Sequence, residues 1–175
     1  MRRKIYEEIL KWKKRSAGQT ALLIDGARRV GKSYIAEKFA AAEYKSYLLI
    51  DFNRAPKEVT DLFENYLNDL DTLFMYLSGF YNTKLYERET LIILDEVQLC
   101  RYDYLETGSL MSIKKNVKDI LIPSEEEHLK MYPLDFEEFL WALDNETLMP
   151  LIQTCYEKKQ PMGQALHRKA MDYFR

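Results

Sequence analysis

The sequence predicts an α/β fold with a mostly parallel sheet, and two features of the chain lead to that prediction. Short apolar runs without alternation, which suit strands covered on both faces, occur at residues 21–25, 47–52 and 90–94. Segments with apolar residues at helical spacing lie between them, at 33–42 and 58–77. Strands that alternate with helices are typical of parallel sheets. We therefore expect three layers, with helices on both faces of one sheet.

Elements on either side of this alternation are also predicted. Residues 3–15 have the apolar spacing of a helix that ends in a basic turn. Residues 102–106 and 117–122, bounded by turn residues, are predicted strands. The run Ser124–Glu127 fits a capping box and predicts the start of a helix.

The remainder of the chain is predicted to be helical. A helix is expected over 134–143, and residues 147–174 are helical with a break near 161–163. We expect a domain over residues 1–146 and a helical segment over 147–175.

Length, composition and charge exclude several classes of protein. A chain of 175 residues fits one domain with a short appendage, and 47% apolar with 31% charged residues indicates a folded globular protein. The net charge of -2 gives no global basic field for nucleic acid or an anionic membrane. Cys100 and Cys155 lack CxxC spacing, which argues against a zinc site and for a reducing compartment. No signal peptide and no apolar stretch near the ~20 residues of a membrane span is seen, so we expect a cytoplasmic protein.

The strongest motif is the phosphate-loop pattern GxxxxGK[ST] in GARRVGKS, residues 26–33. Its glycines let the backbone curl so that N–H groups point at phosphate oxygens, and the following helix directs its positive dipole end at the anion. Lys32 is expected to bind the β- and γ-phosphates and Ser33 to ligate Mg²⁺. The predicted nucleotide-binding residues are Gly26, Ala27, Arg28, Arg29, Val30, Gly31, Lys32, Ser33 and Tyr34.

A second signal is LIILDE, where an aliphatic strand delivers Asp95 and Glu96 to its carboxyl end. Ligands bind at that end of the strands in open α/β sheets. Asp95 is expected to hold the magnesium, and Glu96 to polarise an attacking water as a general base. Strands often end in acidic loops, so this pair carries weight because it follows a phosphate loop. The Asp-Glu pair favours a water-activating ATPase over a GTPase or a small-molecule kinase.

Residues with less specific signals complete the predicted site. Thr107 and Ser109 follow the expected strand at 102–106 and are candidates to sense the γ-phosphate, although an ordinary Ser/Thr turn explains them nearly as well. An arginine is expected to stabilise phosphoryl charge. Spacing selects none of the candidates, which are Arg28, Arg29, Arg101, Arg168 and Arg175.

Taken together, GARRVGKS, LIILDEVQ, YLETGSL and IPSEEEHLKMYPLDFEEFL resemble the bacterial and archaeal AAA-type ATP-binding proteins. The resemblance covers roughly residues 3–175. It implies strand order 5-1-4-3-2, ATP rather than GTP as the nucleotide, and a sensor near Thr107–Ser109. It also implies a C-terminal effector region, often described as winged-helix plus nuclease-like, that this chain does not contain.

One internal departure from the family pattern concerns the connection after Gln98. The family has a helix there, whereas here Leu99–Arg101 are all that precede the next expected strand. A parallel crossover needs about a dozen residues. Either this protein has lost the helix, which puts the sensor geometry in doubt, or the sequence omits a stretch there, which we expect.

The leading functional prediction is Mg²⁺-dependent ATP binding with slow hydrolysis that drives an effector or partner. The rival is a nucleotide-dependent switch with negligible turnover, acting on a protein partner or another copy of the chain. A third reading, a nucleic-acid-associated ATPase, has support only from the basic end of the first helix at residues 11–15, which a solvated helix end explains more simply.

Overall fold

The computed structural model describes residues 2–16, 18, 20–96 and 126–174. These residues divide into two compact units. The larger unit contains residues 5–132, and the smaller contains residues 2–4 together with 133–174.

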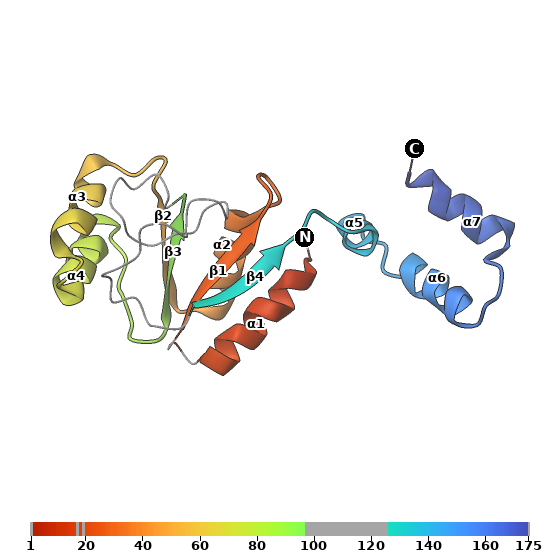
Figure 1. Cartoon of the computed structure of the whole chain (residues 1–175), viewed down its shortest axis with the longest axis horizontal. Helices are drawn as coiled ribbons and strands as arrows, with labels where there is room; N and C mark the ends of the chain where they lie inside the picture. The colour runs from red at the N-terminus through yellow and green to blue at the C-terminus, as the bar shows by residue number, and fades with distance from the viewer. Residues whose placement is uncertain (1, 17, 19, 97–125, 175) are drawn as a thin grey trace. The chain divides into compact units, whose positions relative to one another are not determined.

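Four strands in the larger unit form two parallel pairs (Figure 1). β1 (Ala21–Gly26) pairs with β4 (Glu126–Met131), and β2 (Ser46–Asp51) pairs with β3 (Thr90–Asp95). The prediction of an α/β fold with parallel strands is therefore confirmed for the described residues. A single sheet in the order 5-1-4-3-2 stays a prediction.

β4 is an element that the sequence analysis assigned wrongly. Glu126 and Glu127 belong to a strand, not to the start of a helix. The backbone N–H and C=O groups of β1 need partners along an edge, and pairing with β4 satisfies them. The predicted strands at 102–106 and 117–122, and Ser124 of the predicted capping box, lie outside the described residues.

The helices of the larger unit are α1 (Lys4–Ser16), α2 (Lys32–Glu43), α3 (Lys57–Tyr66) and α4 (Leu70–Phe80). α1 and α2 lie close to their predicted bounds. The helical spacing over 58–77 is confirmed, and the segment is divided into α3 and α4. The Asp69 carboxylate accepts a hydrogen bond from Thr72 N at 3.1 Å and so caps a new helix there.

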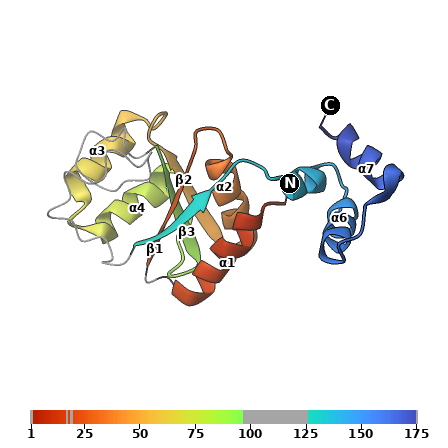
Figure 2. The same cartoon turned by 45° about the vertical axis from the view of Figure 1, so that its right-hand side comes forward.

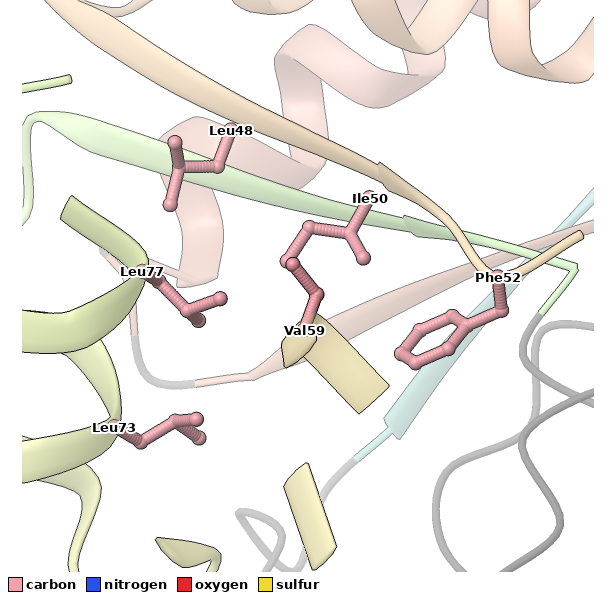
Figure 3. Packing of buried hydrophobic residues seen from close by; sticks show 6 residues of the cluster. All are labelled: Leu48, Ile50, Phe52, Val59, Leu73 and Leu77. Atoms are coloured by element: carbon pink, nitrogen blue, oxygen red, sulfur yellow. The ribbon is translucent and has the colours of Figure 1, made fainter. Parts of the chain in front are cut away.

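One face of the β2–β3 pair packs against α3 and α4. Leu48 and Ile50 of β2 point toward Val59, Leu73 and Leu77 (Figure 3). All five side chains are almost completely buried. Burying an aliphatic side chain of this size stabilises a fold by roughly 1.5–3 kcal/mol, so this cluster is a main support of the strand pair.

The opposite face packs against α1 and α2. Ile9 and Trp12 of α1 lie in one cluster with Ile35 and Phe39 of α2 and with Met131 of β4. Leu22 and Ile24 of β1 and Leu91 of β3 pack against the same cluster. Figure 2 shows the strands of this unit between α3–α4 and α1–α2.

The smaller unit contains α5 (Phe136–Ala142), α6 (Leu148–Glu157) and α7 (Gly163–Asp172). A capping box between Asp135 and Glu138 begins α5. Glu138 also holds the N-terminal segment: its Oε1 accepts a hydrogen bond from Lys4 N at 2.6 Å and lies 3.3 Å from Nε of Arg3. The Arg3–Glu138 pair is buried, so removal of either partner would leave a charge uncompensated.

Within the described residues, no helix combines the length and the apolar character that crossing a bilayer requires.

Candidate nucleotide-binding site

The phosphate loop leads from the end of β1 into the start of α2. Two of its residues, Arg29 and Gly31, have a left-handed backbone conformation. Gly31 has φ 94° and ψ 28°, a conformation that glycine adopts without a steric penalty. Arg29 also has a positive φ, of 66°, which is uncommon for a residue with a side chain. Backbone that alternates in this way forms concavities whose N–H groups bind anions.

The first glycine of the loop lies directly against β4. A Cβ atom on Gly26 would stand 2.2 Å from the carbonyl oxygen of Met131, far inside any tolerated contact. Gly26 N also donates a 2.6 Å hydrogen bond to Oδ1 of Asp25. Glycine is therefore required at residue 26 by close packing of two backbones, in addition to any role toward phosphate.

The N-terminus of α2 offers its N–H groups without competition. Gly31 is the N-cap, so no side chain caps the helix, and its first turn contains no acidic residue. The first N–H groups of a helix have no intrahelical partner, and the helix dipole favours negative charge at this end. The start of α2 is thus suited to bind a phosphate group.

Lys32 is directed back over the loop that precedes it. Its Nζ donates hydrogen bonds to the carbonyl oxygens of Gly26 at 3.0 Å and Ala27 at 3.1 Å. An ammonium group has three donors, so these two bonds leave capacity for a phosphate oxygen. The positive charge is therefore held above the loop, where a bound polyphosphate would need it.

Ser33 and Asp95 are brought together although they lie far apart in the sequence. Ser33 Oγ donates a hydrogen bond of 2.5 Å to Oδ2 of Asp95, so the start of α2 meets the carboxyl end of β3. A hydroxyl and a carboxylate that converge in this way are hard oxygen ligands of the kind that Mg²⁺ prefers. The residues present thus fit a magnesium ion that would also be held by phosphate oxygens and water.

Glu96 follows Asp95 directly and has an unusual backbone. Its φ is 53°, in the left-handed region, and its side chain is partly buried. Non-glycine residues with such a conformation are held there by their surroundings and are enriched at functional sites. The carboxyl end of β3 therefore turns sharply at the residue predicted to be the general base.

Some of the other predicted residues lie outside the described part of the chain. Thr107, Ser109 and Arg101 lie outside the described residues, so their roles stay predictions. Arg28 and Arg29 are exposed on the loop. Arg168 belongs to α7 in the smaller unit.

The sequence analysis missed polar residues at the ends of the other strands. Asp51 ends β2 in register with Asp95 of β3, and Arg54 lies in the turn that follows. A signal was present, since YLLID at residues 47–51 has the same form as LIILD at 91–95: an apolar run that ends in aspartate. Asp25 ends β1 in the same way.

Comparison with known proteins finds one family model that matches this part of the chain. Residues 18–102, which hold the phosphate loop and the Asp95-Glu96 pair, match the family model of an AAA domain. The match is consistent with an AAA-type ATPase domain over these residues. An AAA domain suggests a P-loop α/β fold and nucleotide binding. No curated protein and no solved structure matches the chain.

Proposed function

We propose that this AAA domain binds ATP with Mg²⁺ and hydrolyses it slowly to drive an effector or partner. The observation that carries the proposal is the hydrogen bond between Ser33 and Asp95, with Lys32 held over the loop beside it. When held by Ser33 and Asp95, Mg²⁺ would neutralise charge on the phosphates.

Each residue of the proposed site would have a distinct part in this chemistry. The backbone N–H groups of residues 26–34 would surround the phosphates, and Lys32 would add a positive charge. Ser33 and Asp95 would hold the metal ion. Glu96 would accept a proton from the attacking water, with Thr107 or Ser109 orienting the γ-phosphate.

Slow turnover is proposed because neither Arg28 nor Arg29, the predicted arginines described in the larger unit, contacts Ser33 or Asp95. An arginine that stabilises the transition state is worth about 10³–10⁵ in rate, and without one hydrolysis is slow. A turnover of many per second by a monomer would contradict this part of the proposal.

A three-layer fold with strand order 5-1-4-3-2 is part of the same proposal. Two of its neighbouring pairs have support: β2 beside β3, and β4 in the place expected for the fifth strand, beside β1. Helices pack on both faces of the β2–β3 pair, which also favours three layers.

The partner is proposed to be a protein, either a C-terminal effector region or another copy of the chain, in the cytoplasm. The basic residues of α1 give little support to nucleic acid. Lys11 pairs with Glu8, Lys13 lies 3.9 Å from Glu43, and Arg15 contacts Glu127. These carboxylates offset much of the positive charge that a nucleic acid would need.

The test is steady-state ATP hydrolysis with Mg²⁺, with nucleotide binding measured in parallel. Glu96→Gln is expected to lower turnover by about 10²–10⁴ while binding survives, because the general base is lost and the phosphate contacts are kept. Lys32→Ala is expected to weaken binding by about 100-fold or more, because buried phosphate charge loses its cation.

Two matched variants control for unspecific effects. Lys38→Ala removes an exposed lysine from the same helix, and Glu64→Gln neutralises an exposed glutamate on α3; both should behave as the unaltered chain. If ATP binds in a Lys32-dependent way but the unaltered chain and Glu96→Gln are equally inert, the domain is a nucleotide-dependent switch. If no nucleotide binds, the proposal fails.

A further inference from the structure

We propose that Arg54 contacts the terminal phosphate, and that through this contact the site distinguishes a nucleoside triphosphate from a diphosphate. The inference rests on the proposed function, because it assumes that a nucleotide binds at the phosphate loop. It concerns a residue that lies in no recognised motif of the sequence.

Arg54 lies just beyond the carboxyl end of β2, beside the carboxyl end of β3. Asp51 of β2 and Asp95 of β3 are partners in the parallel register, and Phe52 N donates a 3.0 Å hydrogen bond to the carbonyl oxygen of Asp95. Neighbouring strands are about 4.8 Å apart. The turn after β2 therefore begins one strand away from the carboxylate that contacts Ser33.

Asp51 and Asp95 lie on the face of the strand pair that is turned toward α2. Tyr47 of β2 donates a hydrogen bond from its hydroxyl to Oε1 of Glu37 on α2 at 3.2 Å. Side chains alternate along a strand, so Asp51, four residues on, lies on the same face as Tyr47. Asp95 lies on that face too, since it contacts Ser33 of α2.

The turn that follows β2 is held by two hydrogen bonds to Asp51. Arg54 N donates to the carbonyl oxygen of Asp51 at 2.9 Å, and Asn53 N donates to Oδ1 of Asp51 at 2.9 Å. These two hydrogen bonds form a compact turn in which the aspartate side chain imitates a backbone acceptor. The backbone of Arg54 is thus fixed relative to the ends of both strands.

The guanidinium group, in contrast, is only loosely held. Its Nε lies 3.7 Å from Oδ2 of Asp51, and the arginine side chain is 85% exposed. Ion pairs this exposed contribute little to stability, so little free energy opposes movement of the group toward another anion. A guanidinium fork matches the oxygens of a phosphate group well.

The last step is the expected position of the terminal phosphate. Ser33 and Asp95 would hold a metal ion that neutralises charge on the terminal phosphates, so we expect the γ-phosphate at the β3 side of the loop. Arg54 is then near the γ-phosphate and further from the rest of the nucleotide. A diphosphate lacks the group that Arg54 contacts.

The experiment compares the affinities of ADP and a non-hydrolysable ATP analogue, both with Mg²⁺, for the full chain and its variants. For Arg54→Ala we expect the analogue to bind about ten- to a hundredfold more weakly, and ADP to bind within about twofold of the unaltered chain. Arg54→Lys should recover part of the loss, since it keeps the charge without the fork.

Lys57→Ala is the matched control. Lys57 begins α3 three residues further on and is 87% exposed, so the variant removes the same charge from nearly the same place. Its ratio of ATP-analogue to ADP affinity should not change. Where turnover is measurable, Arg54→Ala should raise KM and leave kcat nearly unchanged, because the contact is formed already in the bound ground state.

The inference is overturned if Arg54→Ala weakens both nucleotides equally, if it weakens neither, or if Lys57→Ala reproduces its effect. Failure of the proposed function is distinguishable, because the unaltered chain would then bind neither ADP nor the analogue. ADP binding by Arg54→Ala also shows that the variant is folded.

Discussion

The two ends of the β2–β3 pair differ in how their polar groups are satisfied. At the amino end, Lys45 N donates to the carbonyl oxygen of Glu89 at 2.9 Å, and the Ser46 and Thr90 hydroxyls are hydrogen-bonded at 2.7 Å. Thr90 Oγ1 also accepts a 2.7 Å hydrogen bond from Tyr86 N. The Lys45 ammonium lies 4.0 Å from the centre of the Tyr86 ring and 3.5 Å from the Glu89 carboxylate.

At the carboxyl end, two aspartates stand side by side. Asp51 and Asp95 are partners in the register and share a face, so like charges are neighbours there. The nearby Arg54 is mostly exposed, and Glu96 continues the chain with φ 53°. Like charges on opposite strand positions destabilise a sheet, as does a left-handed non-glycine residue.

The polar groups at the amino end of this strand pair are matched in a way that favours stability, whereas those at the carboxyl end suit the proposed binding site. The amino end has donors matched with acceptors and cations matched with anions. The carboxyl end holds groups in an arrangement that a metal ion and phosphates would complete. Changes at the amino end should therefore reduce stability and not binding, and changes at the carboxyl end should do the reverse.

The largest expected effect comes from Asp95→Asn at the carboxyl end. We expect Mg²⁺-dependent nucleotide hydrolysis to fall by about 100-fold or more, because charge stabilisation at the phosphates is lost. The free energy of unfolding should change by less than about 1 kcal/mol, since asparagine still accepts from Ser33 and the repulsion with Asp51 is removed. Hydrolysis assays and urea unfolding test both parts, with the exposed Asp71 of α4 changed to asparagine (Asp71→Asn) as control. If the free energy of unfolding fell by as much as the activation free energy of hydrolysis rose, the carboxyl end would be needed for stability as well, which would contradict this prediction.

A moderate effect of the opposite kind is expected for Thr90→Val at the amino end. Valine has the same shape but cannot accept from Tyr86 N or bond with Ser46, so a backbone N–H loses its partner. We expect unfolding to become easier by about 1–3 kcal/mol, with nucleotide affinity within about twofold of the unaltered chain. Thr90→Ser keeps the hydroxyl and should recover most of the stability. Weaker nucleotide binding without a loss of stability would contradict the prediction.

The smallest effect is expected for Asp69, which lies at neither end of the strand pair. Hydrogen bonds from the Thr72 hydroxyl and backbone hold the pKa of Asp69, the cap of α4, below its usual 3.8. A lowered folded-state pKa gives stability that is complete above the unfolded pKa and is lost as the pH falls through the folded value. We therefore expect unfolding of the unaltered chain to become easier below about pH 4.

Asp69→Asn provides the reference for this acid effect, because asparagine also caps helices and does not titrate. The difference in unfolding free energy between the two proteins should narrow as the pH falls from neutral toward about 3. If the difference is independent of pH, the Asp69 carboxylate does not contribute through its charge.

Much of the fold was predictable because its signals are local. The unalternating apolar runs of β1, β2 and β3 and the helical spacing of α1 and α2 identified these elements close to their observed bounds. The apolar repeat over 58–77 continues through the break between α3 and α4, so it concealed the break. Asp69 with Thr72 was the available signal, since an aspartate three residues before a hydrogen-bonding partner is typical of an N-cap.

β4 was not predicted because its stability comes from a distant partner. Its acidic start matches a helix cap locally, and only pairing with β1 makes it a strand. Leu129 and Met131, two residues apart on one face, gave a weak sign of alternation. The actual capping box lies at Asp135 and Glu138, where the same local pattern holds a helix start.

The candidate site, like the fold, was predictable from the sequence only in part. The motifs pointed to Ser33 and Asp95 as metal ligands, and the structure brings these side chains into contact; their role in binding metal stays a prediction. The backbone of Glu96 and the turn that holds Arg54 follow from tertiary structure, which spacing in the sequence does not encode.

The close contact between Gly26 and Met131 has a consequence for the synthesis of the protein. The first residue of the phosphate loop is packed against a strand that leaves the ribosome about a hundred residues later. Contacts this distant in the sequence form late, because the intervening chain must first be closed into a loop. A nascent chain that ends before β4 would carry the complete GARRVGKS motif and yet lack the backbone that shapes its beginning. Nucleotide at the proposed site would stabilise the folded domain by mass action once this strand is in place.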